Sequence, residues 1–145
     1  MKTFALILLL VFSGEPHEKE LPLASAKLRV EGITSIQGNL GILVFNSSLG
    51  FPSKADEAIL NLKVKVESET MEIDLGELPT GSYAFAILHD KNSNKVMDKG
   101  LLGIPKEPFG FSNTDKIPFG APSFQDAKVL INEENRIITI RLLEI

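Results

Sequence analysis

The residues best suited to do chemistry lie in one polar segment, which runs from His89 to Asp98. Its oxygen-bearing side chains fall on alternate positions, and a backbone carbonyl falls where the next donor belongs. Calcium takes about six to eight such hard oxygen ligands, and a tight coil that turns every second residue inward supplies them. The spacing matches the first nine positions of a calcium loop. We therefore expect a calcium site whose ligands are Asp90, Asn92, Asn94, Val96 and Asp98.

Two positions depart from that calcium loop. Position six is Lys95 where glycine is expected, and Leu101 stands where a bidentate glutamate is expected. A side chain in the left-handed conformation of position six costs on the order of 1 kcal/mol. Glu107 can replace the missing glutamate only if the chain folds back. The alternative is a metal-free turn, in which the Asp and Asn side chains hydrogen-bond to the backbone.

Catalysis and zinc binding are further interpretations of the same segment. His89 and Asp90 are the residues a hydrolase would use, but the sequence marks neither a nucleophile nor an oxyanion hole. Zinc needs Cys or His partners, and the chain has no Cys and only 2 His. We therefore expect a non-catalytic protein and keep a hydrolase as the remote alternative.

The polar segment opens a long stretch without alternation, from Asp90 to Ser123, which also holds four of the 8 Pro. A loop of this length in a compact domain is either functional or disordered, and its three Phe argue against disorder. We expect one ordered loop that forms the functional surface. Phe109, Phe111 and Phe119 then either bind a glycan or peptide without metal or plug the core.

The rest of the chain must position this loop, and it shows short blocks in which apolar and polar residues alternate. Such blocks predict half-buried strands. A helical turn or two over 55–61, with Ser53 as cap, is the only helix we expect. The predicted strands lie at 28–33, 40–45, 60–66, 71–75, 82–88, 127–131 and 138–142. The block at 40–45 is instead apolar on both sides and predicts a central strand buried on two faces.

The short turns between these blocks predict two hairpins, one joining 60–66 to 71–75 and one joining 127–131 to 138–142. The strand count and the near absence of helical periodicity predict an all-β fold. We expect an antiparallel seven-stranded β-sandwich with one long ordered loop.

The N-terminus is typical of an exported protein. Lys2 precedes an unbroken apolar run, and small residues follow it, which is the order of a signal peptide. The run is too short to span a bilayer. We expect a signal peptide at 1–14, a leader at 15–25 and a single domain at 26–145. The mature protein is then secreted or periplasmic and does not span a membrane.

Charge excludes one class of partner. The chain has 15 Lys and Arg against 19 Asp and Glu, for a net charge of −4. It therefore lacks the basic surface that neutralises a phosphate backbone, and nucleic acid is not expected as a partner. A cell-surface glycan or protein is the partner class that the exported location favours.

Several of these strings resemble one bacterial family, known as domain of unknown function 2141. The likeness covers roughly 28–142, and it is carried by 78–84, by His89 to Asp98, and by 103–113 and 122–124. The resemblance implies an exported protein with a prealbumin-like or immunoglobulin-like β-sandwich, and it implies no activity. The family commonly has glycine where this chain has Lys95. The polar segment is also similar to the calcium loops of bacterial surface adhesins, which carry the acid that Leu101 lacks.

Overall fold

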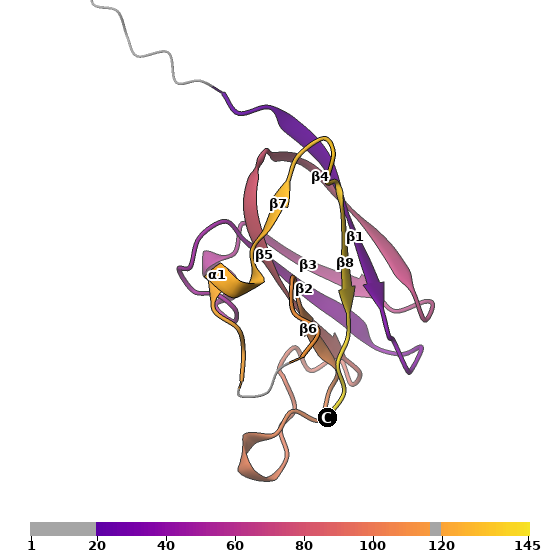
Figure 1. Cartoon of the computed structure of the whole chain (residues 1–145). Helices are drawn as coiled ribbons and strands as arrows, with labels where there is room; N and C mark the ends of the chain where they lie inside the picture. Colours follow the sequence, from indigo (N-terminus) through magenta and orange to yellow (C-terminus); the bar gives the residue numbers. More distant parts are fainter. Residues whose placement is uncertain (1–19, 117–119) are drawn as a thin grey trace, which may run out of the picture.

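The structure is a computed structural model, and it describes residues 20–116 and 120–145. Within these residues, two β-sheets enclose one apolar core (Figure 1). The smaller sheet has the strand order β4-β1-β8, and the larger has the order β3-β2-β5-β6, with β7 also pairing with β5. The strands are β1 (Leu23–Glu31), β2 (Asn39–Phe45), β3 (Leu60–Lys65), β4 (Met71–Pro79), β5 (Gly81–Asp90), β6 (Phe109–Phe111), β7 (Val129–Ile131) and β8 (Ile137–Arg141).

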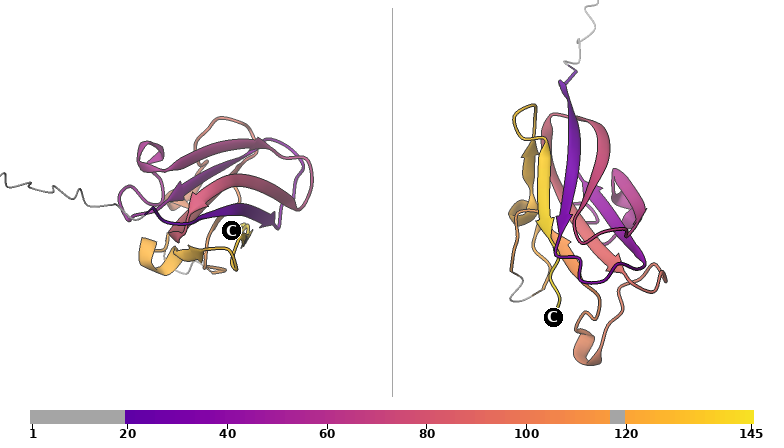
Figure 2. Two further views of the ribbon diagram at one scale, coloured as in Figure 1. Left: turned by 90° about the horizontal axis from the view of Figure 1, so that it is seen from above. Right: turned by 90° about the vertical axis from the view of Figure 1, so that its right-hand side faces the viewer.

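Alternation of apolar and polar residues places one face of each sheet in the core. Figure 2 shows how the strands are arranged in two further views. On β1, Leu28 and Val30 are fully buried, and on β2 Leu40 and Ile42 are fully buried from the opposite sheet. All four belong to one cluster between the sheets. The expectation of a mostly β protein with two sheets is confirmed, with eight strands in the described residues instead of seven.

Both predicted hairpins are wrong. β3 pairs with β2 while β4 pairs with β1, so the chain crosses from one sheet to the other between them. In the same way, β7 pairs with β5 while β8 pairs with β1. The physical reason is that two strands with one apolar face each can bury those faces against each other across the core. The β1–β8 pair is also parallel, whereas every pair was expected to be antiparallel.

The predicted loop from Asp90 to Ser123 contains a strand, β6, that the sequence pattern did not indicate. Its middle residue is Gly110, and a glycine hides the alternation of a three-residue strand. A Cβ at this position would lie 2.9 Å from the Ile140 side chain and 3.1 Å from the Arg141 carbonyl oxygen. Glycine therefore lets β6 pass close to β8, and this approach fixes the edge of the larger sheet.

The helical segments are short. The turns expected over 55–61 shrink to one 3-10 turn, η1 (Ala55–Glu57), whose N-cap is Lys54 instead of Ser53. They end early because β3 already begins at Leu60. The other helical segments are η2 (Leu101–Gly103) and α1 (Phe124–Ala127). Of the helices in the described ranges, none has the length and apolar content needed to cross a membrane.

The N-terminal boundaries differ slightly from those expected. β1 begins at Leu23, so residues 23–25 of the predicted leader lie in the smaller sheet. The predicted signal peptide at 1–14 lies outside the described residues. The segment after β5, which carries the candidate site, lies at the end of the molecule opposite residue 20 (Figure 1).

Candidate functional site

Asp90, the last residue of β5, closes the polar loop through its carboxylate. One oxygen accepts a hydrogen bond from the Asn94 backbone N–H at 3.0 Å, and the other accepts one from Lys95 at 2.8 Å. The residue is only 4% exposed. Both carboxylate oxygens are therefore committed to the start of the loop, in the pattern expected of a metal-free turn.

Asn92, Asn94 and Asp98 are also brought together. The amide groups of Asn92 and Asn94 donate to the two carboxylate oxygens of Asp98, at 2.6 and 2.9 Å. The side-chain oxygen of Asn94 accepts the Val96 N–H at 2.9 Å. The five predicted calcium ligands thus lie in one coil. Among the described residues, no group of three or more His, Cys, Asp or Glu is arranged to hold a metal ion.

The chain does fold back, and this places Glu107 under the same coil. The Lys106 N–H donates to the Asp98 carbonyl at 2.8 Å. The Glu107 carboxylate, 5% exposed, accepts the backbone N–H groups of Lys91 and Asp98 at 2.9 and 3.1 Å. Two buried carboxylates, Asp90 and Glu107, therefore hold the two ends of the coil. Charged acceptors form strong hydrogen bonds with backbone amides.

His89 and Asp90 do not form a catalytic pair. They are neighbours on a strand, so their side chains point to opposite faces of the sheet. His89 is fully buried, with Nε2 2.9 Å from the Gln37 carbonyl oxygen, and its Nδ1 has no hydrogen-bond partner in the described residues. The hydrolase interpretation therefore finds no acid–base dyad here.

Two of the three predicted Phe residues lie side by side on β6. Phe109 is 7% exposed and Phe111 is half-buried, with ring centroids 6.0 Å apart. The Phe111 ring also meets Phe51, which in turn packs edge-on against Phe45. Phe119 lies outside the described residues. The β6 rings are thus largely packed against the sheet, and they also line a groove on its outer face.

The outer face of the larger sheet is apolar at its centre. One row across the strands consists of Lys63, Gly41, Leu88 and Phe109. The next row consists of Asn61, Leu43, Ala86 and Phe111. The small residues Gly41 and Ala86 sit on the two central strands, so larger neighbours rise on either side of them. The result is a groove whose floor is formed by the two central strands, β2 and β5.

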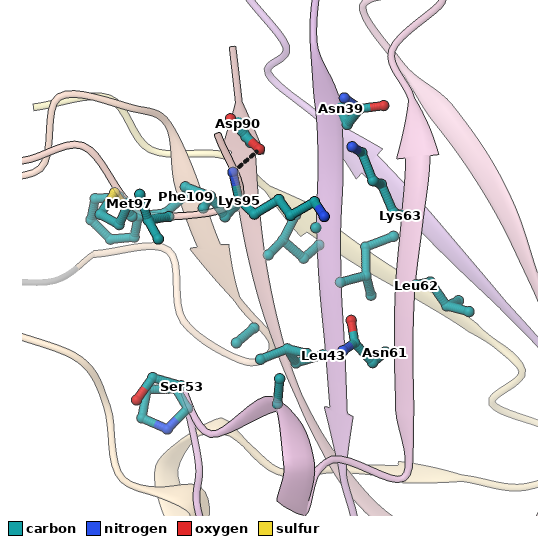
Figure 3. Close-up of a pocket in the computed structure, with 18 of the residues that line it drawn as sticks. Asn39, Leu43, Ser53, Asn61, Leu62, Lys63, Asp90, Lys95, Met97 and Phe109 are labelled. Carbon is teal, nitrogen blue, oxygen red and sulfur yellow. Dashed lines mark hydrogen bonds between the residues drawn. The ribbon is translucent and has the colours of Figure 1, made fainter. Parts of the chain in front are cut away.

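Two connecting segments border this groove, which has a volume of about 720 Å³. The polar loop contributes Lys95, Val96 and Met97 at one end, and the segment before β3 contributes Pro52, Ser53 and Ala55. In Figure 3, the Lys95 side chain extends from the loop across the groove toward β2, on the side of Asn39 and Lys63. The volume falls within the roughly 300–1,000 Å³ of small-molecule sites.

Comparison with known proteins identifies the family of this chain. A bacterial family described as an uncharacterized protein conserved in bacteria, domain of unknown function 2141, matches residues 28–139. The chain belongs to this family. Neither a curated protein nor a solved structure matches significantly. The match spans every residue that lines the groove, from Asn39 to Phe111, so the groove lies within the part of the chain that defines the family.

The cations around the loop differ in their surroundings. Lys91 forms an ion pair with Glu144 at 2.8 Å. Hydrogen bonds from Lys91 and Thr34 lower the pKa of the Glu144 carboxyl. Lys63 and Lys95 form no ion pair with any acid among the described residues. The groove therefore carries two uncompensated ammonium groups beside an apolar floor.

Sequence reasoning indicated the loop and the β6 rings but not the groove. Its floor is formed by a glycine and an alanine, residue types that carry no chemical signal of their own. The available signal was the Ala84–Ala86 alternation on β5, which predicts a face of small side chains and does not say what lies beside it.

Proposed function

We propose that this chain is an exported, non-catalytic binding protein, and that the groove on the outer face of its larger sheet is the ligand site. The observation that carries the proposal is the apolar surface of the central strands, with Gly41 and Ala86 as its floor, which no described element covers completely. Large exposed apolar surfaces on soluble proteins mark binding sites. The N-terminal signal pattern supports a secreted or periplasmic location, and a prealbumin-like or immunoglobulin-like sandwich is the fold type we propose.

The surroundings of the groove favour an apolar ligand over a glycan or an extended peptide. β2 and β5 are paired on both sides, so their backbone groups are used in the sheet and do not face the groove. Asn39, Asn61 and Ser53 are the main neutral polar groups along its rim. Phe109 is too buried to stack its ring face on a sugar. Apolar contact is therefore the main interaction the groove offers.

Gly41→Val tests this proposal by filling the floor of the groove. The nearest atom to a Cβ at Gly41 is the Leu88 carbonyl oxygen at 3.9 Å, so a Cβ at this position makes only an ordinary van der Waals contact. We expect wild-type protein to bind a neutral naphthylamine dye that fluoresces in apolar surroundings. The variant should bind it about tenfold more weakly or worse, a loss of about 1.4 kcal/mol, because the new side chain occupies the floor on which the dye lies. Fluorescence titration measures both affinities.

Thr139→Val is the control, because it adds apolar surface to the outer face of the smaller sheet instead. It should leave dye binding unchanged. Melting curves establish that Gly41→Val is folded. Equal dye affinity in the wild type and in folded Gly41→Val would contradict the proposed site.

A calcium ion in the polar loop is a second candidate, and the backbone at Lys95 favours it. Lys95 has a φ of 70°, the left-handed conformation that position six of a calcium loop requires. This candidate predicts a higher melting midpoint in calcium than in chelator, since a ligand at 100 times its dissociation constant stabilises by about 2.7 kcal/mol. Asp98→Asn should remove the rise. Equal midpoints in calcium and in chelator would contradict the ion site.

A further inference from the structure

We infer that the ligand of the groove is a free single-chain carboxylate, whose tail lies on the apolar floor and whose head group meets Lys63 and Lys95. This inference rests on the proposed function, because it assumes that the groove is the ligand site. It adds the chemical class of the ligand and the direction in which the ligand lies.

The positive charge gathers at one end of the groove. Lys63 and Lys65 alternate on the outer face of β3, opposite Gly41 and Asn39 on β2. Lys95 reaches toward the same side from the polar loop (Figure 3). All three are exposed, and none is paired with an acid among the described residues. An anionic head group placed here gains Coulomb attraction without displacing an existing ion pair.

The acidic groups near the groove do not cancel this charge. Asp90 lines the groove beneath Lys95, but it is 4% exposed, both of its oxygens accept backbone N–H groups from the loop, and it is one carboxylate against three Lys. Asp56 and Glu57 belong to η1, next to the lining residue Ala55 and away from the polar loop, and the N-cap of η1 is Lys54. These three residues carry a net charge of −1, whereas the loop end has three Lys. This difference in charge favours an anionic amphiphile with its head group at the loop end.

The rest of the groove suits a single alkyl chain. From the Lys63 row, the floor continues to the row of Leu43, Ala86 and Phe111 and ends at Pro52. Phe51 supports that end through edge-on contacts with Phe45 and Phe111. Each central strand has one small residue on this face, Gly41 on β2 and Ala86 on β5. Gly41 is paired with Leu88 and Ala86 with Leu43, so a larger side chain stands beside each small one. One chain fits between these walls.

The test uses full-length protein and a series of saturated carboxylates that differ by two methylenes, each paired with the alcohol of equal length. Displacement of the neutral dye gives the affinities, at concentrations below micelle formation. We expect affinity to rise about fourfold per methylene until the tail reaches Pro52. Each carboxylate should bind more tightly than its alcohol, and added salt should reduce that advantage.

Lys63→Gln and Lys95→Gln test the head-group contact, with Lys27→Gln on β1 as the matched control on the other sheet. We expect each groove variant to weaken carboxylate binding by up to about fivefold, the range of exposed charge pairs. Each variant should weaken a carboxylate more than the alcohol of equal length, so the ratio of carboxylate to alcohol affinity should fall in both. The control should bind every ligand as the wild type does.

The outcomes separate the two proposals. If carboxylate and alcohol bind equally, and neither Lys variant matters, the head-group contact is refuted while the groove stands. If the dye binds but no chain-length dependence appears, the single-chain ligand is refuted. If dye binding itself is absent or survives Gly41→Val, the proposed function fails. Binding to anionic phospholipid vesicles, with no binding of the free carboxylates, would overturn the inference in favour of a membrane surface.

Discussion

Ser112 shows how much one buried hydroxyl contributes to holding β6 in place. Its Oγ accepts the Phe85 N–H at 2.9 Å and donates to the Ala127 carbonyl at 2.5 Å, and the residue is fully buried. The hydroxyl therefore joins β5 to α1 at the point where the β6 segment ends. Without it, a backbone donor and a backbone acceptor would both lose their partner inside the protein.

Ser112→Ala is therefore expected to lower the free energy of unfolding by about 1–3 kcal/mol, the cost of leaving buried polar groups unsatisfied. Urea denaturation measures the loss. Ser82→Ala is the control. Ser82 is an exposed residue of β5, the strand to which Ser112 is hydrogen-bonded, and its variant should unfold like the wild type. A loss no larger than that of the control would show that water or another group replaces the hydroxyl.

At the residue scale, sequence patterns predicted which side chains cluster but not what they bind. Asp90 to Asp98 do form one coil, as the alternate spacing indicated. The side-chain oxygens of Asp90, Asn92 and Asn94 accept backbone N–H groups, and those of Asp98 accept side-chain amides. Spacing alone does not distinguish an amide proton from a cation. The role of Glu107 in holding the coil depends on its hydrogen bond with the Lys91 N–H, which lies 16 positions earlier in the chain. Local periodicity does not predict a contact over that separation.

At the scale of elements, the polar loop contains a conformational conflict at Lys95. Its φ of 70° lies in the left-handed region, which costs a residue with a Cβ roughly 1–2 kcal/mol. Lys95→Gly removes that cost but adds backbone entropy to the unfolded chain. We expect a net gain of about 0.5 kcal/mol in the free energy of unfolding, measured by urea denaturation, and weaker carboxylate binding in the same variant.

Lys99→Gly is the matched control for this prediction. Lys99 pairs with Pro105 in an isolated bridge and does not have a positive φ, so the same substitution should destabilise by about 0.5–1 kcal/mol. If both glycine variants lose stability together, the strain at Lys95 is not relieved by glycine. We therefore expect the free energy of unfolding to rise in Lys95→Gly and to fall in Lys99→Gly.

Element faces were predictable and element partners were not. Alternation indicates which side of a strand is buried, and alternation together with the continuous apolar block at 40–45 located seven of the eight strands. A short turn between two such strands fits a hairpin and equally fits a crossing between sheets, as β3 and β4 show. β6 escaped because a three-residue strand with Gly110 at its centre is too short for a periodic signal.

For the whole molecule, composition and periodicity were enough to predict a mostly β fold with two sheets. They did not predict that the last strand would lie beside the first. β8 pairs in parallel with β1, and the following residues reach both sheets: the Leu142 N–H donates to the Glu31 carbonyl, and Leu143 exchanges hydrogen bonds with Phe109. Pairings this distant along the chain depend on the complete sequence.

That arrangement has a consequence for how the protein is made. A nascent chain that lacks β8 and the residues just after it has no partner for the outer edge of β1 and no clamp on Phe109, which forms one wall of the groove. Neither the smaller sheet nor that wall can therefore be completed until residues 137–143 have been synthesised. The order of synthesis delays closure of the sandwich to the last of its strands.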